Sequence, residues 1–433
     1  MVADGNLSVV AVTLVGSHAR RGEMKKRFSY RAYPDADQRA MLAKTFGCAR
    51  VVYNDFVAYC RDSYEKRGVI PDLNEVKSIV TAQAKRTPER QWLAEVSSVP
   101  LQEAARDAQS GYRAFFMSIA GTRRGPRVNP PRMKRKSGRQ VATFTTRAFT
   151  VRADGCSRWG FVRLAKIGEV KFRLSRPLPS CPSTVKVICE PSGEYRVSFV
   201  VEVEAACPAA VESVAGVDLG LAHLAIVAGS SGERYRVPNQ RNLRSVEHKL
   251  AKAQRRLSRK EKGGRNRDKA RIGVARLHAR VARSRKDQLH NVARRLVDEN
   301  QVIAVENLDV VALGKTRFAK SIADAGWGIL LGLLRSKARE SGREVVVIDR
   351  WFPSTQMCSQ CGRVDGPKPL RIRIWKCECG AVLDRDYNAA VNIMLAAGLA
   401  ESLNAHGGVV RRVLALADPS ELGTHLADAR ASA

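Results

Sequence analysis

The chain is short of the features that send a protein into a membrane. No apolar run approaches the ~18 residues that a membrane-spanning helix needs, and the longest candidate near the start, Leu7 to Gly16, follows no basic residues. We therefore expect a cytoplasmic protein with no membrane partner. Acidic residues are also scarce, because 42 Asp and Glu stand against 75 Lys and Arg, for a formal charge of +33.

That positive charge indicates a large polyanion as the partner. It is far greater than solubility alone requires. The basic residues are spread along most of the chain instead of forming one amphipathic stripe beside an apolar anchor. A nucleic acid therefore fits this distribution of charge better than a lipid surface does.

Cysteines are few, and four of the ten stand in two close pairs within MCSQCG and KCECG. Two sulfur pairs on two turns predict one tetrahedral Zn²⁺ site of zinc-ribbon type. Four thiolates leave no open position for chemistry, so the expected role is structural. The other six cysteines are scattered, as is typical of small buried side chains in a reducing compartment. The predicted ligands are Cys358, Cys361, Cys377 and Cys379.

The first half of the chain changes composition several times. Residues 1–23 precede a second methionine, and we expect them to be an extension. Residues 24–35 read as a strand and a turn, and residues 36–122 show apolar residues at helical spacing. Residues 123–139 are rich in basic residues and proline and lack acidic residues, which predicts a basic linker. Residues 140–205 are rich in strands and favour a small barrel or sheet.

The second half follows a different order. From Val214 onward, strands AGVDLGLAHLAIVAG, RYRV, QVIAVENL and EVVVID alternate with helical segments, as in an RNase H-like sheet. Residues 241–300 form a strongly basic helical insertion, with a hairpin break expected at Gly263 and Gly264. Charged helices are usually solvated faces, but such faces balance the two signs of charge, whereas this segment holds 20 basic and 6 acidic residues. We expect the tail, 399–433, to be variable and disordered.

Three acidic residues occupy apolar elements. Asp218 lies in the strand AGVDLG, Glu306 ends the strand QVIAVENL, and Asp386 starts the apolar helix of DRDYNAAVNIML. A carboxylate in an apolar strand is costly unless a metal or a basic group offsets its charge. Any one of these acids could instead be a helix cap or a turn residue. Their occurrence in one predicted sheet favours a shared site.

The first strand, the fourth strand and the last helix of an RNase H-like sheet converge. Carboxylates there hold two divalent cations about 4 Å apart, which serve to activate water against a phosphodiester. Hard oxygen ligands favour Mg²⁺ or Mn²⁺. The expected products carry 5′-phosphate and 3′-hydroxyl ends. Three other acids are weaker candidates for the metal site: Asp309, at a loop, Asp349, at a strand end, and Asp384, ahead of the final helix.

Several motifs together resemble one known family. GVDLGLAHLA, VENLDV, IADAGWG, DRWFPSTQMCSQCG and CECGAVLDRDYNAAVNI are similar to the TnpB family of transposon-encoded RNA-guided nucleases and to the related compact type V CRISPR effectors. The similarity extends over most of the chain and leaves out residues 1–23 and the tail. In one departure, the second cysteine pair has a single intervening residue where two are more usual, and this tighter turn can still bind zinc.

The resemblance implies an RNA-guided DNA endonuclease that cuts beside a short flanking motif, with Asp218, Glu306 and Asp386 as its catalytic residues. It also implies a multidomain α+β fold. The implied domains are a β-barrel wedge domain (24–35 and 140–205), a helical recognition domain (36–122), a RuvC-like nuclease domain (214–350 and 384–398) and a zinc-ribbon insertion (351–383).

The implied partners are a structured guide RNA and a double-stranded DNA target, in a ribonucleoprotein that we expect to be monomeric. Base pairing would supply most of the specificity. The candidate contacts to nucleic acid are basic residues of the linker, of the helical insertion and of the ribbon. They are Arg123, Arg124, Arg127, Lys134, Arg135, Lys136, Lys252, Arg255, Arg256, Arg259, Arg265, Arg276, Arg280, Arg371 and Arg373.

Three other functions compete with this interpretation. A transposase would also use three carboxylates on an RNase H-like fold, but the zinc ribbon directly before DRDYNAA argues against it. A guide-directed DNA-binding protein without efficient cleavage and a structural RNA-binding protein are the others. The complete set of Asp218, Glu306 and Asp386 argues against both of these.

Overall fold

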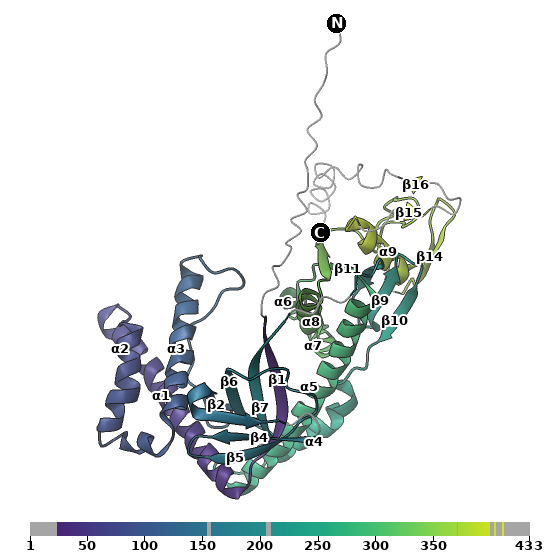
Figure 1. Cartoon of the computed structure of the whole chain (residues 1–433). Helices are drawn as coiled ribbons and strands as arrows, with labels where there is room; N and C mark the ends of the chain where they lie inside the picture. The colour runs from purple at the N-terminus through teal and green to yellow at the C-terminus, as the bar shows by residue number, and fades with distance from the viewer. Residues whose placement is uncertain are drawn as a thin grey trace. The chain divides into compact units, whose positions relative to one another are not determined.

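Two units, Met1–Ala205 and Ala206–Ala433, divide the chain in the computed structural model. Each unit has its own sheet and its own apolar core, which confirms the expected multidomain α+β fold (Figure 1). The predicted extension, 1–23, lies outside the described residues. The structure describes residues 24–153, 157–204, 209–369, 371–398, 402–403 and 409–410.

A seven-stranded antiparallel sheet forms the centre of the first unit, in the order β2-β6-β7-β1-β5-β4-β3. Strands β2 and β3 stand at opposite ends of this order, yet only a short turn, Thr146–Ala148, joins them. So short a connection requires the sheet to curl until its edges approach each other. The strands are β1 (Met24–Tyr33), β2 (Gln140–Thr145), β3 (Phe149–Arg152), β4 (Trp159–Leu164), β5 (Gly168–Arg173), β6 (Thr184–Cys189) and β7 (Tyr195–Val203).

Aromatic side chains fill the inside of this curled sheet. The rings of Phe172 and Phe199 lie 5.3 Å apart between centroids, and Tyr30 lies 5.4 Å from Phe172. Gly160 makes room for them, because a Cβ there would lie 2.3 Å from the ring of Phe172. The strands therefore enclose a packed core and no channel.

Helices α1 (Ala36–Arg67), α2 (Leu73–Ser78) and α3 (Ser98–Ile119) make up the rest of the first unit, with short helical turns between α2 and α3. Helix α1 begins at a capping box, in which Asp35 accepts from the Gln38 amide and Gln38 accepts from the Asp35 amide. The linker 123–139 contains no helix or strand.

The second unit contains a five-stranded sheet in the order β10-β9-β8-β11-β12. Strand β9 pairs antiparallel with both β8 and β10, whereas β11 runs parallel to β8 and to β12. The strands are β8 (Val214–Asp218), β9 (His223–Gly229), β10 (Arg234–Pro238), β11 (Val302–Glu306) and β12 (Glu344–Ile348).

Helices cover both faces of this sheet. Val217, Ile303 and Val305 share an apolar core with Leu289 of α5 (Arg265–Glu299) and residues of α8 (Trp327–Glu340). The opposite face contacts α9 (Arg385–Ala396), where Ile393 packs against residues of β11 and β12. Strands β9, β11 and β12 therefore carry apolar side chains on both faces, as sheets covered by helices do.

Gly216 of β8 allows α9 to lie unusually close to the sheet. A Cβ at this position would lie 2.0 Å from the carbonyl oxygen of Ala390 and 2.9 Å from Cβ of Met394. A glycine inside a strand often marks such a close backbone approach.

The basic insertion consists of α4 (Glu247–Ser258) and α5, which meet at the two glycines that the sequence analysis singled out. Gly263 has a φ of +90°, a conformation that glycine adopts without strain, and Gly264 precedes the first residue of α5. Two short helices, α6 (Val310–Leu313) and α7 (Ala319–Ala325), lead into α8. Among the described residues, no helix combines the length and the apolar character that crossing a bilayer demands.

Between β12 and α9 the chain forms a small lobe around the hairpin of β13 (Ile374–Lys376) and β14 (Val382–Asp384). The prediction of a disordered tail needs one correction, because β15 (Ser402–Leu403) pairs with β16 (Val409–Val410). Valine favours extended backbone, which helps so short a pair to form. The other tail residues, 399–401, 404–408 and 411–433, lie outside the described residues.

Candidate active site and zinc centre

The three predicted catalytic acids come from neighbouring elements of the second unit. Asp218 is the last residue of β8, and Glu306 is the last residue of β11. These strands are parallel, with Val217 opposite Val305, so both carboxylates emerge at the same edge of the sheet. Asp386 is the second residue of α9, the helix that packs against β8 at Gly216.

The electrostatics of Asp218 indicate that the three carboxylates are close. The pKa of Asp218 is raised to about 7, first by burial and then by the negative charges of Glu306 and Asp386, while Arg385 opposes the shift. Burial also raises the pKa of Glu306, against the hydrogen bond that the Ser354 hydroxyl donates to it. Such crowded carboxylates favour a bound cation or a proton.

The spacing of the acids suits more than one ion. Among the described residues, the four predicted cysteines are the one set of three or more His, Cys, Asp or Glu whose donor atoms all lie within 4.8 Å of one another. The three carboxylates are therefore spread more widely. A pair of cations about 4 Å apart bridges such a set better than a single ion does, and oxygen donors suit Mg²⁺ or Mn²⁺.

Two further side chains hold the third acid and its helix. Nη1 of Arg373 donates to both oxygens of Asp386 at 3.1 Å. Asp384 is the N-cap of α9 and accepts from the amides of Asp386 and Tyr387. Arg236 of β10 donates to Asp384 and lies over the ring of Tyr387, 4.7 Å from its centroid.

Two of the acids that were weaker candidates for the metal site have local structural roles. Asp349 accepts a hydrogen bond from the Trp351 amide at 2.7 Å. Asp309 was expected to begin a loop, and this needs correction: its side chain accepts from the Ala312 amide and caps α6. A carboxylate with this pattern of hydrogen bonds is a helix cap.

The four predicted zinc ligands lie together. Sγ of Cys358 lies 3.8 Å from Sγ of Cys379, and Sγ of Cys361 lies 3.6 Å from Sγ of Cys377. Zn–S bonds of ~2.3 Å place the sulfurs of a tetrahedron about 3.8 Å apart. The Ala381 amide donates to Cys379 and is the largest cause of its lowered pKa, about 7. The site fits Zn²⁺, and the single-residue spacing of the second pair does not prevent this geometry.

Two buried asparagines join the zinc lobe to α9. Asn388 donates to the Met357 carbonyl at 2.7 Å and accepts from the Ser359 amide at 2.9 Å. Asn392 donates to the carbonyls of Ser354 and Met357 at 2.8 and 2.7 Å. The segment that begins the zinc lobe is thus held to the helix that carries Asp386.

Sequence reasoning missed these supporting residues. Asn388 and Asn392 stand four positions apart in a mostly apolar helix, which places them on one face. This spacing could have predicted a pair of buried polar side chains. Another missed residue is Asp324, a buried acid that pairs with Arg285 at 2.9 Å and accepts from the Leu243 amide. No local pattern marks Ser354 or Arg236 as neighbours of the carboxylates.

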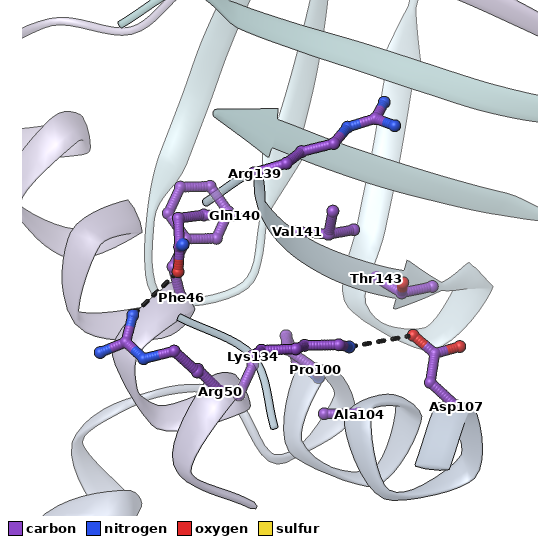
Figure 2. A pocket seen from close by; sticks show the side chains of 11 residues that line it. Phe46, Arg50, Pro100, Ala104, Asp107, Lys134, Arg139, Gln140, Val141 and Thr143 are labelled. Atoms are coloured by element: carbon purple, nitrogen blue, oxygen red, sulfur yellow. Dashed lines mark hydrogen bonds and ion pairs between the residues drawn. The ribbon is translucent and has the colours of Figure 1, made fainter. Parts of the chain in front are cut away.

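The candidate nucleic-acid contacts are exposed, except for the half-buried Arg123. Some of them already have protein partners. Arg373 pairs with Asp386, and Lys134 lies 3.7 Å from the ring centroid of Tyr53 and 4.0 Å from Asp107. Figure 2 shows Lys134 beside a small cavity of the first unit, directed toward Asp107. Its ammonium group therefore helps to fix the linker against the helices.

Models of known families match three parts of the chain. Residues 198–317 match a family described as probable transposase, residues 327–393 match the Cas12f1-like TNB domain, and residues 24–68 match a helix-turn-helix domain. The last description does not fit the geometry of the segment, because residues 24–68 form strand β1 and the single helix α1.

Whole-length relatives are also found. A Streptomyces pristinaespiralis protein, provisionally named as an RNA-guided DNA endonuclease, is 43% identical over 88% of this chain and 91% of its own. The Escherichia coli K12 protein InsQ, with the same provisional name, is 27% identical over 85% of this chain and 91% of its own. A Cas12f1-sgRNA-target DNA complex aligns with a TM-score of 0.56 at 12% identity, over 86% of this chain and 98% of that one, which supports the fold alone.

Proposed function

Since the chain belongs to the TnpB family of RNA-guided DNA endonucleases, we propose that it cuts target DNA beside a short flanking motif, directed by a bound RNA. The same motifs serve transposon-associated proteins and compact type V CRISPR effectors, and the proposal covers either setting. One observation carries it. Three acids, from β8, β11 and α9, lie close enough that the charges of Glu306 and Asp386 add to the effect of burial in raising the pKa of Asp218 to about 7.

We further propose that this centre is of the RuvC type. The order β10-β9-β8-β11-β12, with three antiparallel strands followed by two parallel ones, supports an RNase H-like domain. Asp218, Glu306 and Asp386 would hold two Mg²⁺ or Mn²⁺ ions. Such ions, when bound, supply activation of water and stabilisation of the leaving 3′-oxygen.

The surrounding residues prepare the carboxylates for this task. The Ser354 hydroxyl donates to Glu306 and so orients its carboxylate. Asp384 caps α9 and thereby fixes the backbone at Asp386. Arg373 supplies a positive charge to Asp386 from the zinc lobe. Glu306 and Asp386 are therefore positioned before any substrate arrives, which lowers the cost of ordering the site.

We assign the remaining domains by the same logic. The curled sheet of the first unit supports a β-barrel wedge domain, interrupted by the helices of a recognition domain. The four-cysteine lobe supports a zinc-ribbon insertion with one structural Zn²⁺. The exposed basic residues of α4, α5 and the linker are the proposed contacts to RNA and DNA. The working particle is then one chain with one guide RNA, acting in the cytoplasm.

The decisive experiment begins with the RNA that the protein carries. We expect a discrete RNA to co-purify, because the basic surfaces repel one another without a polyanion. In Mg²⁺ the complex should cut DNA that matches the variable end of this RNA, and should spare a scrambled target with the same flanks. Cleavage by RNA-free protein would contradict the proposal, and guided binding without cleavage would favour the non-cutting alternative.

Zinc content provides a separate prediction. Freshly purified, reduced protein should carry one zinc per chain by elemental analysis, because four thiolates at this spacing bind Zn²⁺ tightly. Cys377→Ser should lose most of the metal. Cys181→Ser is the matched control, since Cys181 is an exposed free cysteine of the first unit. Full-length wild-type protein without zinc would show that the lobe folds by other means.

Arg236 offers a test of how α9 is positioned. Arg236→Ala removes the contacts to Asp384 and Tyr387, and we expect about a tenfold rise in the Mg²⁺ concentration for half-maximal cleavage. Arg234→Ala, an exposed change on the same strand, should leave this concentration unaltered. Arg236→Lys should restore part of the loss. An unchanged Mg²⁺ dependence of Arg236→Ala would exclude a positioning role.

A further inference from the structure

Trp351 is the most exposed large apolar side chain among the described residues. Its relative exposure is 78%, whereas Trp327 and Trp375 are exposed by 6% and 7%. Leaving an indole in water forgoes ~2–3 kcal/mol of burial. Tryptophan is among the residue types that are enriched where proteins bind their partners.

The backbone around Trp351 is held in place, so its exposure does not come from a loose segment. Its amide donates to Oδ1 of Asp349 at 2.7 Å. On one side, Arg350 pairs with Asp309 at 3.6 Å. On the other side, Phe352 packs against the apolar cluster that contains Ile393 of α9. The indole is thus projected from an anchored turn.

This turn lies at the rim of the three carboxylates. Ser354, three residues after Trp351, donates to Glu306. Asp309, three residues after Glu306, forms an ion pair with Arg350. Three residues span at most about 10 Å, so both links keep Trp351 near the end of β11.

We propose that Trp351 is a stacking platform for an unpaired nucleobase of the DNA strand that enters the carboxylate site. This inference rests on the proposed function, because it takes a DNA strand as the occupant. An aromatic face beside a phosphodiester-cutting centre can hold the base next to the scissile bond, and stacking is tolerant of base identity. The net charge of +33 favours a polyanion over an apolar protein partner.

Photo-crosslinking tests the contact without requiring cleavage. Target strands with 5-iodouracil at successive positions are bound to the RNA-loaded protein in Ca²⁺, irradiated and digested. The Trp351 peptide should carry the crosslink at one or two adjacent positions, and Trp351→Ala should remove it. Crosslinks that spare this peptide at every position would overturn the inference.

Affinity and cleavage provide the second readout. Trp351→Ala should weaken capture of the entering strand by roughly 5- to 150-fold, and slow cleavage at low target concentration accordingly. Trp351→Phe should retain most of both activities. The control Val311→Ala changes a residue of 75% exposure on α6 and should match wild type. If wild type cuts and Trp351→Ala cuts equally well, the platform is refuted and the proposed function stands. If wild type crosslinks at Trp351 but never cuts, the proposed function fails and the contact stands.

Discussion

Asp386→Ala, Asp218→Ala and Glu306→Ala should each abolish guided DNA cleavage. Each removes one of the carboxylates that would hold the two cations, and the cations contribute several kcal/mol to the transition state. The expected loss of rate is on the order of a thousandfold or more. The measurement is cleavage of a matched target in Mg²⁺, with Ca²⁺ as an ion that should support binding but little cutting.

Binding should survive these substitutions, because the proposed contacts to nucleic acid in α4, α5 and the linker are exposed basic residues outside the carboxylate site. Target retention by the RNA-loaded variants should stay close to that of wild type. Asp287→Ala, which removes an exposed carboxylate of α5, is the matched control and should cut normally. Full cleavage by Asp386→Ala would refute the assignment of the third acid. Cleavage by all three variants would move the nuclease centre elsewhere.

Asp218→Asn separates loss of chemistry from loss of folding. Burial raises the pKa of Asp218 to about 7, well above its ordinary value. Because the folded pKa is the higher one, stability falls as pH rises from the ordinary value toward about 7, and above that pH the full cost of the ionised carboxylate remains in the absence of metal. The variant should therefore melt no lower than wild type at pH 8 in EDTA, while it fails to cut in Mg²⁺. A lower melting temperature would show that the carboxylate has a structural partner.

Gly216→Ala should have the largest effect on stability. Its new Cβ would lie 2.0 Å from the carbonyl oxygen of Ala390, and a backbone atom cannot move aside as a flexible side chain does. Helix α9 would have to shift away from β8, at a cost at or above ~3 kcal/mol. For a unit of this size that corresponds to a fall of about 10 °C in its melting temperature.

The same shift should reduce cleavage, since α9 carries Asp386. The matched control is Gly229→Ala at the end of the neighbouring strand β9, where the nearest atoms lie at 3.7 Å and leave room for a methyl group. Scanning calorimetry of both variants provides the comparison. Equal melting temperatures for the two would mean that α9 does not depend on close contact at Gly216.

The main elements of the site could be read from the sequence because their signals are local. Asp218 and Glu306 each end a short apolar strand, and such a pattern is visible within a few residues. The two cysteine pairs could be recognised as a zinc site from the short spacing within each pair. Ser354 and Arg236 could not be found in this way, because their partners lie 48 and 148 positions away in the chain. Only the folded sheet brings them together.

Charge alone also misleads about individual residues. Lys134 lies in a basic linker and was expected to contact nucleic acid, yet it approaches Asp107 and Tyr53. The partner that a cation finds depends on where its backbone is held, and here Asn54 fixes the linker through the amide and carbonyl of Lys134. Lys134 therefore has a structural role that competes with its proposed contact to nucleic acid.

The position of α9 at the end of the second unit has a consequence for synthesis on the ribosome. The seven-stranded sheet, the helices of the first unit and the basic hairpin are all translated before the helix that carries Asp386. At 5–20 residues per second, completion of the three-acid set follows the first acid by on the order of ten seconds. The nascent chain therefore carries its basic hairpin before it carries the complete set of three acids.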